Sequence, residues 1–415
     1  MSAKHYLLPD YVLKFKCSGC TECCKRWMIT IDRKTVEKYE QLAERDEELA
    51  EMLAAGLKKD KKGRASVRLR NIIKEQTVEQ DGEKKELLSL DTAVCPFLTG
   101  DGFCAIQKRH GLDALSDTCK TFPRNIFLTE RGYEMGLTYA CSTAADTLRE
   151  KKPVEFYQDP EGFDFPDLHE QYGKIGNLLD LKKSSKGNYF EVEELLIDIL
   201  QFREADIDTR LVLLGICIDK LKDGDIKGIR RYLQNLDDDL IKQMRTIPSQ
   251  PTFMMKLIKE AVDKRLLQGI TENEMNRLLA LVYGQLKLLD EVTISEAKVQ
   301  GFLEGYRKYY SLYREEINHV FENYLVNFVF SKKFYTHRYI DGFFLMMFFY
   351  ILIRFFAVAL CMAEDRRVDE DTVIRVIKAV ERSVGHSSAY YENVLKLVKE
   401  GEYHRLPYVI SLINL

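Results

Sequence analysis

Apolar residues recur with the period of an α-helix through the second half of the chain. The spacing i, i+3, i+4, i+7 and i+8, or one close to it, is found in segments 192–200, 254–262, 275–286 and 373–384. Each segment predicts a helix with one apolar face that must pack against a neighbour. Proline, which interrupts helices, is absent between Thr252 and Leu406. Residues 176–415 are therefore predicted to form an α-helical domain of roughly nine to eleven helices.

One segment of this half, residues 342–363, is apolar over almost its whole length. Two interpretations are open, a buried core helix and a membrane span. Arg354 interrupts the segment, and Asp341 and Glu364 flank it. A spanning helix needs about 20 consecutive apolar residues, and an arginine near its centre is costly. We therefore expect a buried helix and no membrane span.

The first 150 residues have a different pattern, with short apolar runs and many turn residues. Asp81-Gly82 lies between two polar-apolar segments and predicts a tight hairpin. Segments 27–31 and 67–73 have modest strand character. Three prolines follow at positions 153, 160 and 166, where they argue against one continuous helix.

The predicted fold class is mainly α. A small cysteine-rich α+β metal-binding domain is expected over residues 1–150. A proline-containing linker is expected over 151–175, and the larger all-helical domain follows over 176–415.

Composition and charge argue against some classes of function. The chain has 415 residues and a formal net charge of −3. A charge so close to zero gives no general attraction to nucleic acid or to anionic membranes. The one basic run, within residues 58–70, contains no interleaved aromatic residue, so we interpret it as a solvated loop.

Cysteine is concentrated in the first part of the chain. Ten cysteines are present, and eight of them lie within the first 141 residues. Cys217 and Cys361 lie in apolar helical segments and are expected to be core residues. The N-terminus lacks a basic segment followed by an apolar one, so we expect a cytoplasmic protein whose thiols stay reduced. A dense cluster of reduced cysteines predicts metal or cluster binding. The eight candidate ligands are Cys17, Cys20, Cys23, Cys24, Cys95, Cys104, Cys119 and Cys141.

The spacing Cys17-x2-Cys20-x2-Cys23-Cys24 is typical of zinc and iron–sulfur sites, because two-residue gaps let successive thiolates turn onto one centre. Neighbouring side chains diverge, so we do not expect Cys23 and Cys24 to bind the same metal atom. Eight thiols could form two zinc sites, one [4Fe–4S] cluster with spare thiols, or two clusters, and the spacing does not choose among them. His5 and His110 are further candidate ligands, although an ordinary surface or core imidazole is the first interpretation of both.

At these residues the chain resembles the flagellin lysine-N-methylases, and more broadly a zinc- or iron-chelating family with a C-x2-C-x2-C-C motif. The first 145 residues carry the similarity, and a Tyr-Leu-Val-Asn element at 324–327 adds a weaker match. The matching segments are 17–24, Cys95-Pro96-Phe97-Leu98, the Gly-Phe-Cys-Ala-Ile-Gln segment at 102–107, the Cys-Lys-Thr-Phe-Pro-Arg segment at 119–124, and Cys141.

The resemblance implies transfer of methyl groups from S-adenosylmethionine to lysine side chains of flagellin. It also implies a [4Fe–4S] cluster, with zinc as the alternative, and metal binding by all eight cysteines. It gives no catalytic base, so the catalytic residues stay unassigned.

The sequence has no glycine-rich segment typical of a Rossmann-like cofactor site. The radical S-adenosylmethionine spacing C-x3-C-x2-C is also absent, because Trp27 stands where the third cysteine would be. The cofactor would then bind in an unconventional way, either at an iron without a cysteine ligand or apart from a purely structural cluster. Arg124 is a candidate for holding the cofactor's carboxylate, and the other interpretation is a structural arginine that braces the cysteine loop.

Aromatic residues are also concentrated, since 17 of the 45 lie within 301–350. Core packing is the first interpretation, and a groove for a partner segment or an adenine ring is the second.

The sequence thus predicts an S-adenosylmethionine-dependent lysine N-methyltransferase that acts on flagellin and holds an iron–sulfur cluster. The alternative is a non-catalytic zinc- or iron–sulfur-binding protein, active in metal handling, electron transfer or scaffolding.

Overall fold

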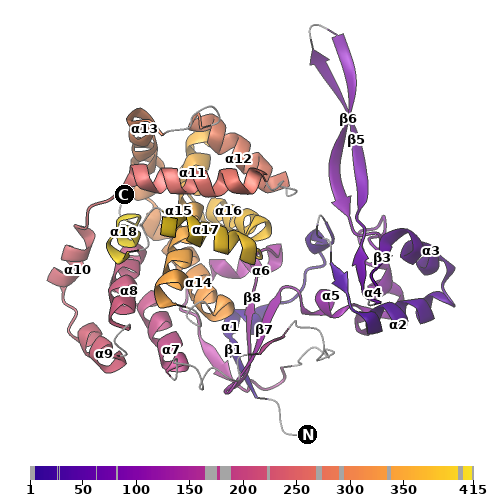
Figure 1. Ribbon diagram of the computed structural model, residues 1–415, viewed down its shortest axis with the longest axis horizontal. Helices are drawn as coiled ribbons and strands as arrows, with labels where there is room; N and C mark the ends of the chain where they lie inside the picture. Colours follow the sequence, from indigo (N-terminus) through magenta and orange to yellow (C-terminus); the bar gives the residue numbers. More distant parts are fainter. Residues whose placement is uncertain are drawn as a thin grey trace.

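The computed structural model describes residues 5–25, 27, 29–61, 63–80, 83–163, 175–177, 188–221, 225–267, 273–288, 294–333, 338–400 and 405–413. A large helical body and a smaller cysteine-rich unit lie beside each other, and a two-stranded arm projects from the smaller unit (Figure 1). The fold class is mainly α, and all strands of the described part lie before residue 178. This confirms the predicted class.

The helical body contains twelve α-helices among the described residues, one more than the predicted range. The four periodic segments fall on α7, α11, α12 and α16, which confirms those predictions. The helices are α7 (Tyr189–Leu200), α8 (Ile207–Leu221), α9 (Ile226–Gln234), α10 (Asp238–Arg245), α11 (Pro251–Leu267), α12 (Asn273–Gln285), α13 (Glu296–Tyr306), α14 (Arg314–Lys332), α15 (Tyr339–Glu364), α16 (Glu370–Ser383), α17 (Ser388–Glu400) and α18 (Leu406–Ser411), with a π-helical turn at Arg307–Ser311.

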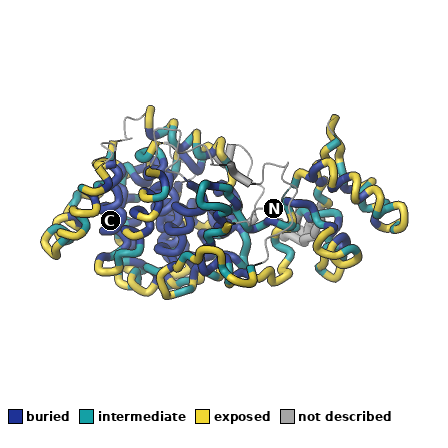
Figure 2. Tube along the Cα trace, turned by 90° about the horizontal axis from the view of Figure 1, so that it is seen from below, coloured by how far each residue is buried: buried dark blue, intermediate teal, exposed yellow. Residues whose placement is uncertain are grey.

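Helix α15 forms the centre of this body and packs against α8, α12, α13, α16 and α17. It is long and apolar enough to cross a membrane, yet 94% of its most apolar 18-residue window lies buried inside the protein. Figure 2 shows buried residues concentrated in this body. The burial agrees with the predicted core helix.

Most of the aromatic band is also core. Tyr306, Tyr310, Tyr324, Phe328 and Phe330 are each at most 3% exposed. Their rings pack on one another, and the ring centroids of Tyr306 and Tyr310 lie 5.1 Å apart. The first interpretation of the band therefore holds for these residues.

A five-stranded sheet packs against the helical body. Its strand order is β10-β7-β8-β1-β9. Strand β1 runs parallel to β8 and antiparallel to β9, and β7 and β8 form a hairpin. Gly132 in this hairpin has a φ of +112°, and a Cβ there would lie 2.4 Å from the carbonyl oxygen of His5. The strands are β1 (Tyr6–Pro9), β7 (Arg124–Thr129), β8 (Gly132–Leu137), β9 (Phe156–Gln158) and β10 (Ile175–Asn177).

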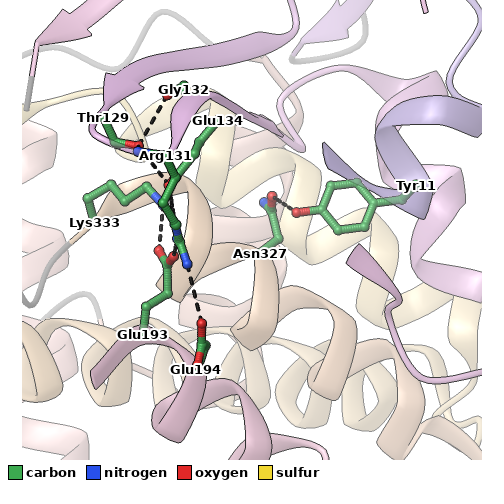
Figure 3. Close-up of polar contacts among 9 residues, drawn as sticks. All are labelled: Tyr11, Thr129, Arg131, Gly132, Glu134, Glu193, Glu194, Asn327 and Lys333. Atoms are coloured by element: carbon green, nitrogen blue, oxygen red, sulfur yellow. Dashed lines mark hydrogen bonds and ion pairs between the residues drawn. The ribbon is translucent and has the colours of Figure 1, made fainter. Parts of the chain in front are cut away.

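Asn327 on α14 fixes the sheet to the helices. Its side-chain nitrogen donates to the carbonyl oxygen of Leu137 at 2.7 Å, and its oxygen accepts from the Tyr11 hydroxyl at 2.8 Å (Figure 3). Leu137 ends β8, and Tyr11 lies on α1 (Asp10–Lys14). The Tyr-Leu-Val-Asn element noted in the sequence therefore has a structural role.

The smaller unit has a core of its own, built around Ile31, Tyr39, Phe97 and Ile106. Its α2 begins after Asp32, whose carboxylate accepts from the Thr35 backbone nitrogen at 2.7 Å. Its elements are β2 (Thr30–Ile31), α2 (Arg33–Ala43), α3 (Glu47–Gly56), β3 (Leu57–Lys59), β4 (Ala65–Val67), β5 (Arg70–Gln80), β6 (Glu83–Val94), α4 (Ala105–His110) and α5 (Asp117–Thr121); α6 (Ser142–Asp146) leads back to the helical body.

The arm is the antiparallel pair of β5 and β6, whose register ends at Gln80 opposite Glu83. This pairing confirms the predicted hairpin, although Asp81 and Gly82 themselves lie outside the described residues. The two other strand predictions are confirmed in part, at Thr30–Ile31 and over β4 and β5. Within the proposed linker, residues 156–158 form β9, while 164–174 lie outside the described part. The domain boundaries stay a prediction.

Candidate functional site

All eight N-terminal cysteines line one cavity of about 600 Å³. None of them is in a disulfide, and all are half-exposed or exposed toward this open space. Cys217 and Cys361, by contrast, are buried in the helical body, as expected. The fold therefore brings together thiols from residue 17 to residue 141.

Short elements place these cysteines. Cys17 and Cys20 lie in the loop after α1, and Cys23 and Cys24 lie in a 3₁₀ turn, Glu22–Cys24. Cys95 directly follows β6, Cys104 precedes α4, Cys119 lies in α5 and Cys141 precedes α6. The Cys95 backbone nitrogen donates to the Cys24 carbonyl oxygen at 2.7 Å, which ties the first cysteine loop to the base of the arm.

The thiols influence one another's ionisation. A hydrogen bond from the Cys24 thiol lowers the pKa of Cys23 to about 7, and the same bond raises the pKa of Cys24. Burial raises the pKa of Cys95 to about 12, and the neighbouring thiols Cys119 and Cys104 add to that rise. Cys23 therefore ionises more easily near neutral pH than an ordinary cysteine does, and a thiolate is the form that binds metals.

The donor set fits a thiolate-held metal or cluster, since soft sulfur ligands select zinc and iron–sulfur centres. Within the ranges that the structure describes, however, no three His, Cys, Asp or Glu side chains already converge as a closed metal-binding group. The eight ligands therefore stay a prediction, and binding would require the thiols to rotate toward a common point.

The two candidate histidines contact carboxylates outside the cavity. His5 Nδ1 lies 2.9 Å from Asp159 Oδ2, and His110 Nε2 lies 3.1 Å from Asp46 Oδ2. Neither residue lines the cavity. A metal role for them also stays a prediction.

Arg124, the first residue of β7, lines the cavity as a candidate anion-binding group. Its Nε is buried without a hydrogen-bond partner, and its guanidinium lies 5.1 Å from the centroid of the Phe15 ring. Among the described residues no carboxylate pairs with it. Burial lowers the pKa of Arg124, although nearby Cys17 and Cys141 oppose this effect. An arginine without a carboxylate partner at a cavity wall suits an anionic ligand.

Two further cavity residues, Arg382 and His386, were not found from the sequence. Arg382 Nη2 donates to the Glu22 carbonyl oxygen at 3.1 Å, and its guanidinium lies 5.7 Å from the Trp27 ring centroid. His386 Nε2 lies 3.2 Å from Thr138 Oγ1, and its ring centroid lies 5.3 Å from that of Trp27. No local signal marks these two residues, because the chain folds back over more than 350 residues to bring them to the cysteine loop.

His386 is expected to titrate well below the ordinary histidine pKa of 6.5. The ring faces the cavity, but surrounding protein desolvates it, and this burial together with the charge of Lys332 lowers its pKa to about 4. The unfolded chain would then bind the extra proton between pH 6.5 and 4, so stability falls as the pH falls through this window. A pH titration of the histidine NMR signals, with His386→Asn for assignment, measures the midpoint. A midpoint at or above 6.5 would contradict the expected environment.

A second polar cluster lies between the sheet and the helices, outside the cavity. Lys333 Nζ donates to Glu134 Oε2 and to Glu193 Oε2, both at 2.5 Å, and Arg131 pairs with the same two glutamates (Figure 3). Burial opposes ionisation of Glu134, but Lys333 and Arg131 outweigh it and hold its pKa below the ordinary value. Burial raises the pKa of Glu193 despite the charge of Lys333.

Comparison with known proteins adds an independent observation. Residues 193–412, just over half of the chain, match the family described as FliB lysine N-methylase C-terminal domain. This matched region includes α16, Arg382 and His386.

Three relatives are each 33% identical over 136 residues, which is 32% of this chain. One is a flagellar biosynthetic protein FliU from Salmonella muenchen, of which 70% is covered. The others are lysine-N-methylases from Salmonella typhimurium and Salmonella choleraesuis, of which 29% is covered. The aligned part thus spans less than a third of those two relatives. No solved structure matches this chain.

Proposed function

This chain belongs to the FliB lysine N-methylase family, and we propose that it transfers methyl groups from S-adenosylmethionine to lysine side chains of flagellin. The single observation that supports this proposal from within the structure is the cavity. It combines thiols for an iron–sulfur cluster with an arginine that no carboxylate neutralises among the described residues. A location in the cytoplasm, where thiols stay reduced, belongs to the same proposal.

The acceptor lysine must lose a proton before it can react. Its ordinary pKa is about 10.4, so it arrives as an ammonium ion at neutral pH. Phe15, Trp27 and Phe122 line the cavity and would remove water from the amine, which favours its neutral form. His386, with its lowered pKa, adds no positive charge there. S-adenosylmethionine, when bound, supplies an electrophilic methyl group.

Arg124 would hold the carboxylate of S-adenosylmethionine, and the eight cysteines would supply the thiolates for the cluster. When bound, a [4Fe–4S] cluster would supply iron and cross-link segments far apart in the chain. Arg124 lies close to Cys17 and Cys141, so the carboxylate end of the donor would lie beside the cysteines. The chain's own contribution is therefore to orient the donor and to exclude water from the amine.

Arg124→Gln is expected to weaken S-adenosylmethionine binding by about tenfold to a hundredfold, the usual range for loss of a charge-assisted hydrogen bond. Isothermal titration of the metal-loaded protein measures the dissociation constant. Arg367→Gln is the matched control, because that side chain is 58% exposed and pairs with Glu316 at the surface. Equal dissociation constants for Arg124→Gln and wild type would instead support a purely structural Arg124.

Anaerobically purified protein, incubated with flagellin and S-adenosylmethionine, tests the whole proposal. Intact-mass measurement is expected to show flagellin gaining mass in steps of one methyl group. The protein itself is expected to be brown and to contain iron and acid-labile sulfide. A preparation that binds no S-adenosylmethionine and leaves flagellin unchanged would favour the alternative of a non-catalytic metal-binding protein, and a colourless zinc-only sample would favour a scaffold.

A further inference from the structure

Eight thiols line one cavity, and they could bind one metal centre or two. Cys23 and Cys24 are adjacent in a 3₁₀ turn, in which successive side chains point about 120° apart. Ligands on adjacent residues are not expected to share one metal atom, although the Cys23 and Cys24 thiols are hydrogen-bonded to each other and both line the same cavity. The backbone contacts of the other cysteines, together with the spacing of the first three, indicate how the eight are grouped.

Cys24 belongs with three cysteines of the smaller unit. The bridge between Lys25 and Val94 is antiparallel, so its register places Cys24 opposite Cys95, and the hydrogen bond between their backbones agrees. Directly opposed residues in such a pair have Cβ atoms about 5 Å apart. Leu98, which bonds to the Cys95 carbonyl oxygen, bridges in turn to Cys104.

Cys119 completes this set. The Thr118 hydroxyl donates to the Thr30 carbonyl oxygen at 3.2 Å, which fixes α5 beside β2. Tyr39, in the core of the smaller unit, lies close to Cys119, Cys104 and Cys95. Cys95 and Cys104 both pack against that core. We call these four residues the dispersed group: Cys24, Cys95, Cys104 and Cys119.

Cys141 lies beside the N-terminal loop that carries Cys17, next to the helical body. The hydroxyls of Ser18 and Thr143 lie 2.6 Å apart, which holds the loop of Cys17 against the start of α6. Cys141 packs against the core of the helical body and not against that of the smaller unit. The thiols of Cys20 and Cys23 lie close to that of Cys141, and Arg124 lies close to both Cys17 and Cys141. Cys23 also lies close to Cys95 and Cys104, so the C-x2-C-x2-C spacing is what assigns it to this side. We call these four residues the loop group: Cys17, Cys20, Cys23 and Cys141.

We propose that the eight thiols hold two separate four-thiolate centres, one in the loop group and one in the dispersed group. The loop group has the C-x2-C-x2-C spacing plus one remote cysteine, a ligand pattern of [4Fe–4S] clusters. The dispersed group has the four thiolates that suit either a tetrahedral zinc ion or a second cluster. Each thiol releases its proton on binding. The division rests on the thiolate-held metal of the proposed function, but not on methyl transfer.

The adjacent pair provides the sharpest test. Wild type, Cys23→Ser, Cys24→Ser, Cys141→Ser and Cys104→Ser are purified anaerobically and reconstituted with ferrous iron, sulfide and zinc. Cys217→Ala, outside the cavity, is the control. Iron, zinc and sulfide per chain are measured together with the absorbance and electron paramagnetic resonance spectra, and circular dichroism checks the fold.

Cys23→Ser is expected to lose the same centre as Cys141→Ser, and Cys24→Ser the same centre as Cys104→Ser, with the other centre retained in each. If both centres contain iron, each variant loses half of the iron; if the second contains zinc, the two pairs lose different metals. The division is wrong if all four variants lose the same signal, if wild type binds a single centre, or if no metal binds.

A second measurement does not depend on folding of the variants. The loaded wild type is treated stepwise with a chelator and an alkylating reagent, and the modified cysteines are identified by mass spectrometry. The loop group is expected to become reactive as one set and the dispersed group as another. Reaction of all eight at one chelator concentration would overturn the division. Methyl transfer to flagellin, assayed on the same wild-type sample, separates this failure from failure of the proposed function.

Discussion

Replacing Lys333 by methionine is expected to lower the free energy of unfolding by about 3–5 kcal/mol, the usual cost of leaving a buried charge without its partner. Lys333 is 2% exposed, and its ammonium group is the link between the carboxylates of Glu134 and Glu193. Methionine keeps most of the chain volume but leaves two buried carboxylates with only Arg131 to balance them. Lys333 is in a left-handed conformation, with φ +50°, and this costs lysine and methionine alike.

Urea denaturation followed by circular dichroism measures this effect. Lys308→Met is the matched control, because that lysine is exposed and pairs with Asp365 at the surface, where the expected change is below about 0.5 kcal/mol. The double variant Lys333→Met/Glu193→Gln is expected to recover part of the loss, since one unbalanced carboxylate is then removed. An unchanged urea midpoint in Lys333→Met would mean that the cluster does not hold the sheet to the helices.

Asp208→Asn is expected to have an effect of similar size, about 3–5 kcal/mol, because it removes the carboxylate that balances Arg354. Arg354 is completely buried in the middle of α15, and its Nη1 donates to Asp208 Oδ1 at 2.9 Å. The Tyr350 hydroxyl donates to the same oxygen at 2.6 Å. The asparagine oxygen could still accept hydrogen bonds, but the guanidinium would keep only neutral partners, such as the Ile413 carbonyl oxygen at 2.6 Å and the Tyr350 hydroxyl at 3.5 Å.

Thermal and urea unfolding both report this loss. Asp239→Asn is the control, since Asp239 is 85% exposed and lies 3.5 Å from Lys242. Asp208→Asn/Arg354→Met is expected to be more stable than Asp208→Asn alone, because removing both charges avoids the unpaired guanidinium. If the double variant is instead less stable than the single one, the charge of Arg354 does not determine the energy of this site.

The helices were predictable because their signal is local. The apolar stripes of α7, α11, α12 and α16 repeat within each segment, and Arg354 distinguishes the buried α15 from a membrane span. The sheet was not predictable, since β1, β9 and β10 contain three or four residues each and pair with strands far away in the chain. Strands of three or four residues are too short to show the alternation of apolar and polar residues that predicts a strand.

The residues of the candidate site were likewise predictable only in part. The cysteines and Arg124 could be chosen from their residue types and spacing, and the fold places all nine around one cavity. Arg382 and His386 could not be chosen, because an arginine at the end of an amphipathic helix and a histidine in the following turn are ordinary in a sequence. Their position becomes meaningful only where α16 meets Glu22 and Trp27.

The distance along the chain between Cys17 and His386 also has a consequence for biosynthesis. The eight thiols leave the ribosome early, whereas the wall formed by Arg382 and His386 is translated only after the central helices. During that interval a nascent chain would present reduced sulfur to oxidants and to stray metal ions without the cover that the finished protein provides. The cavity around these thiols would therefore be completed only after translation has passed residue 386.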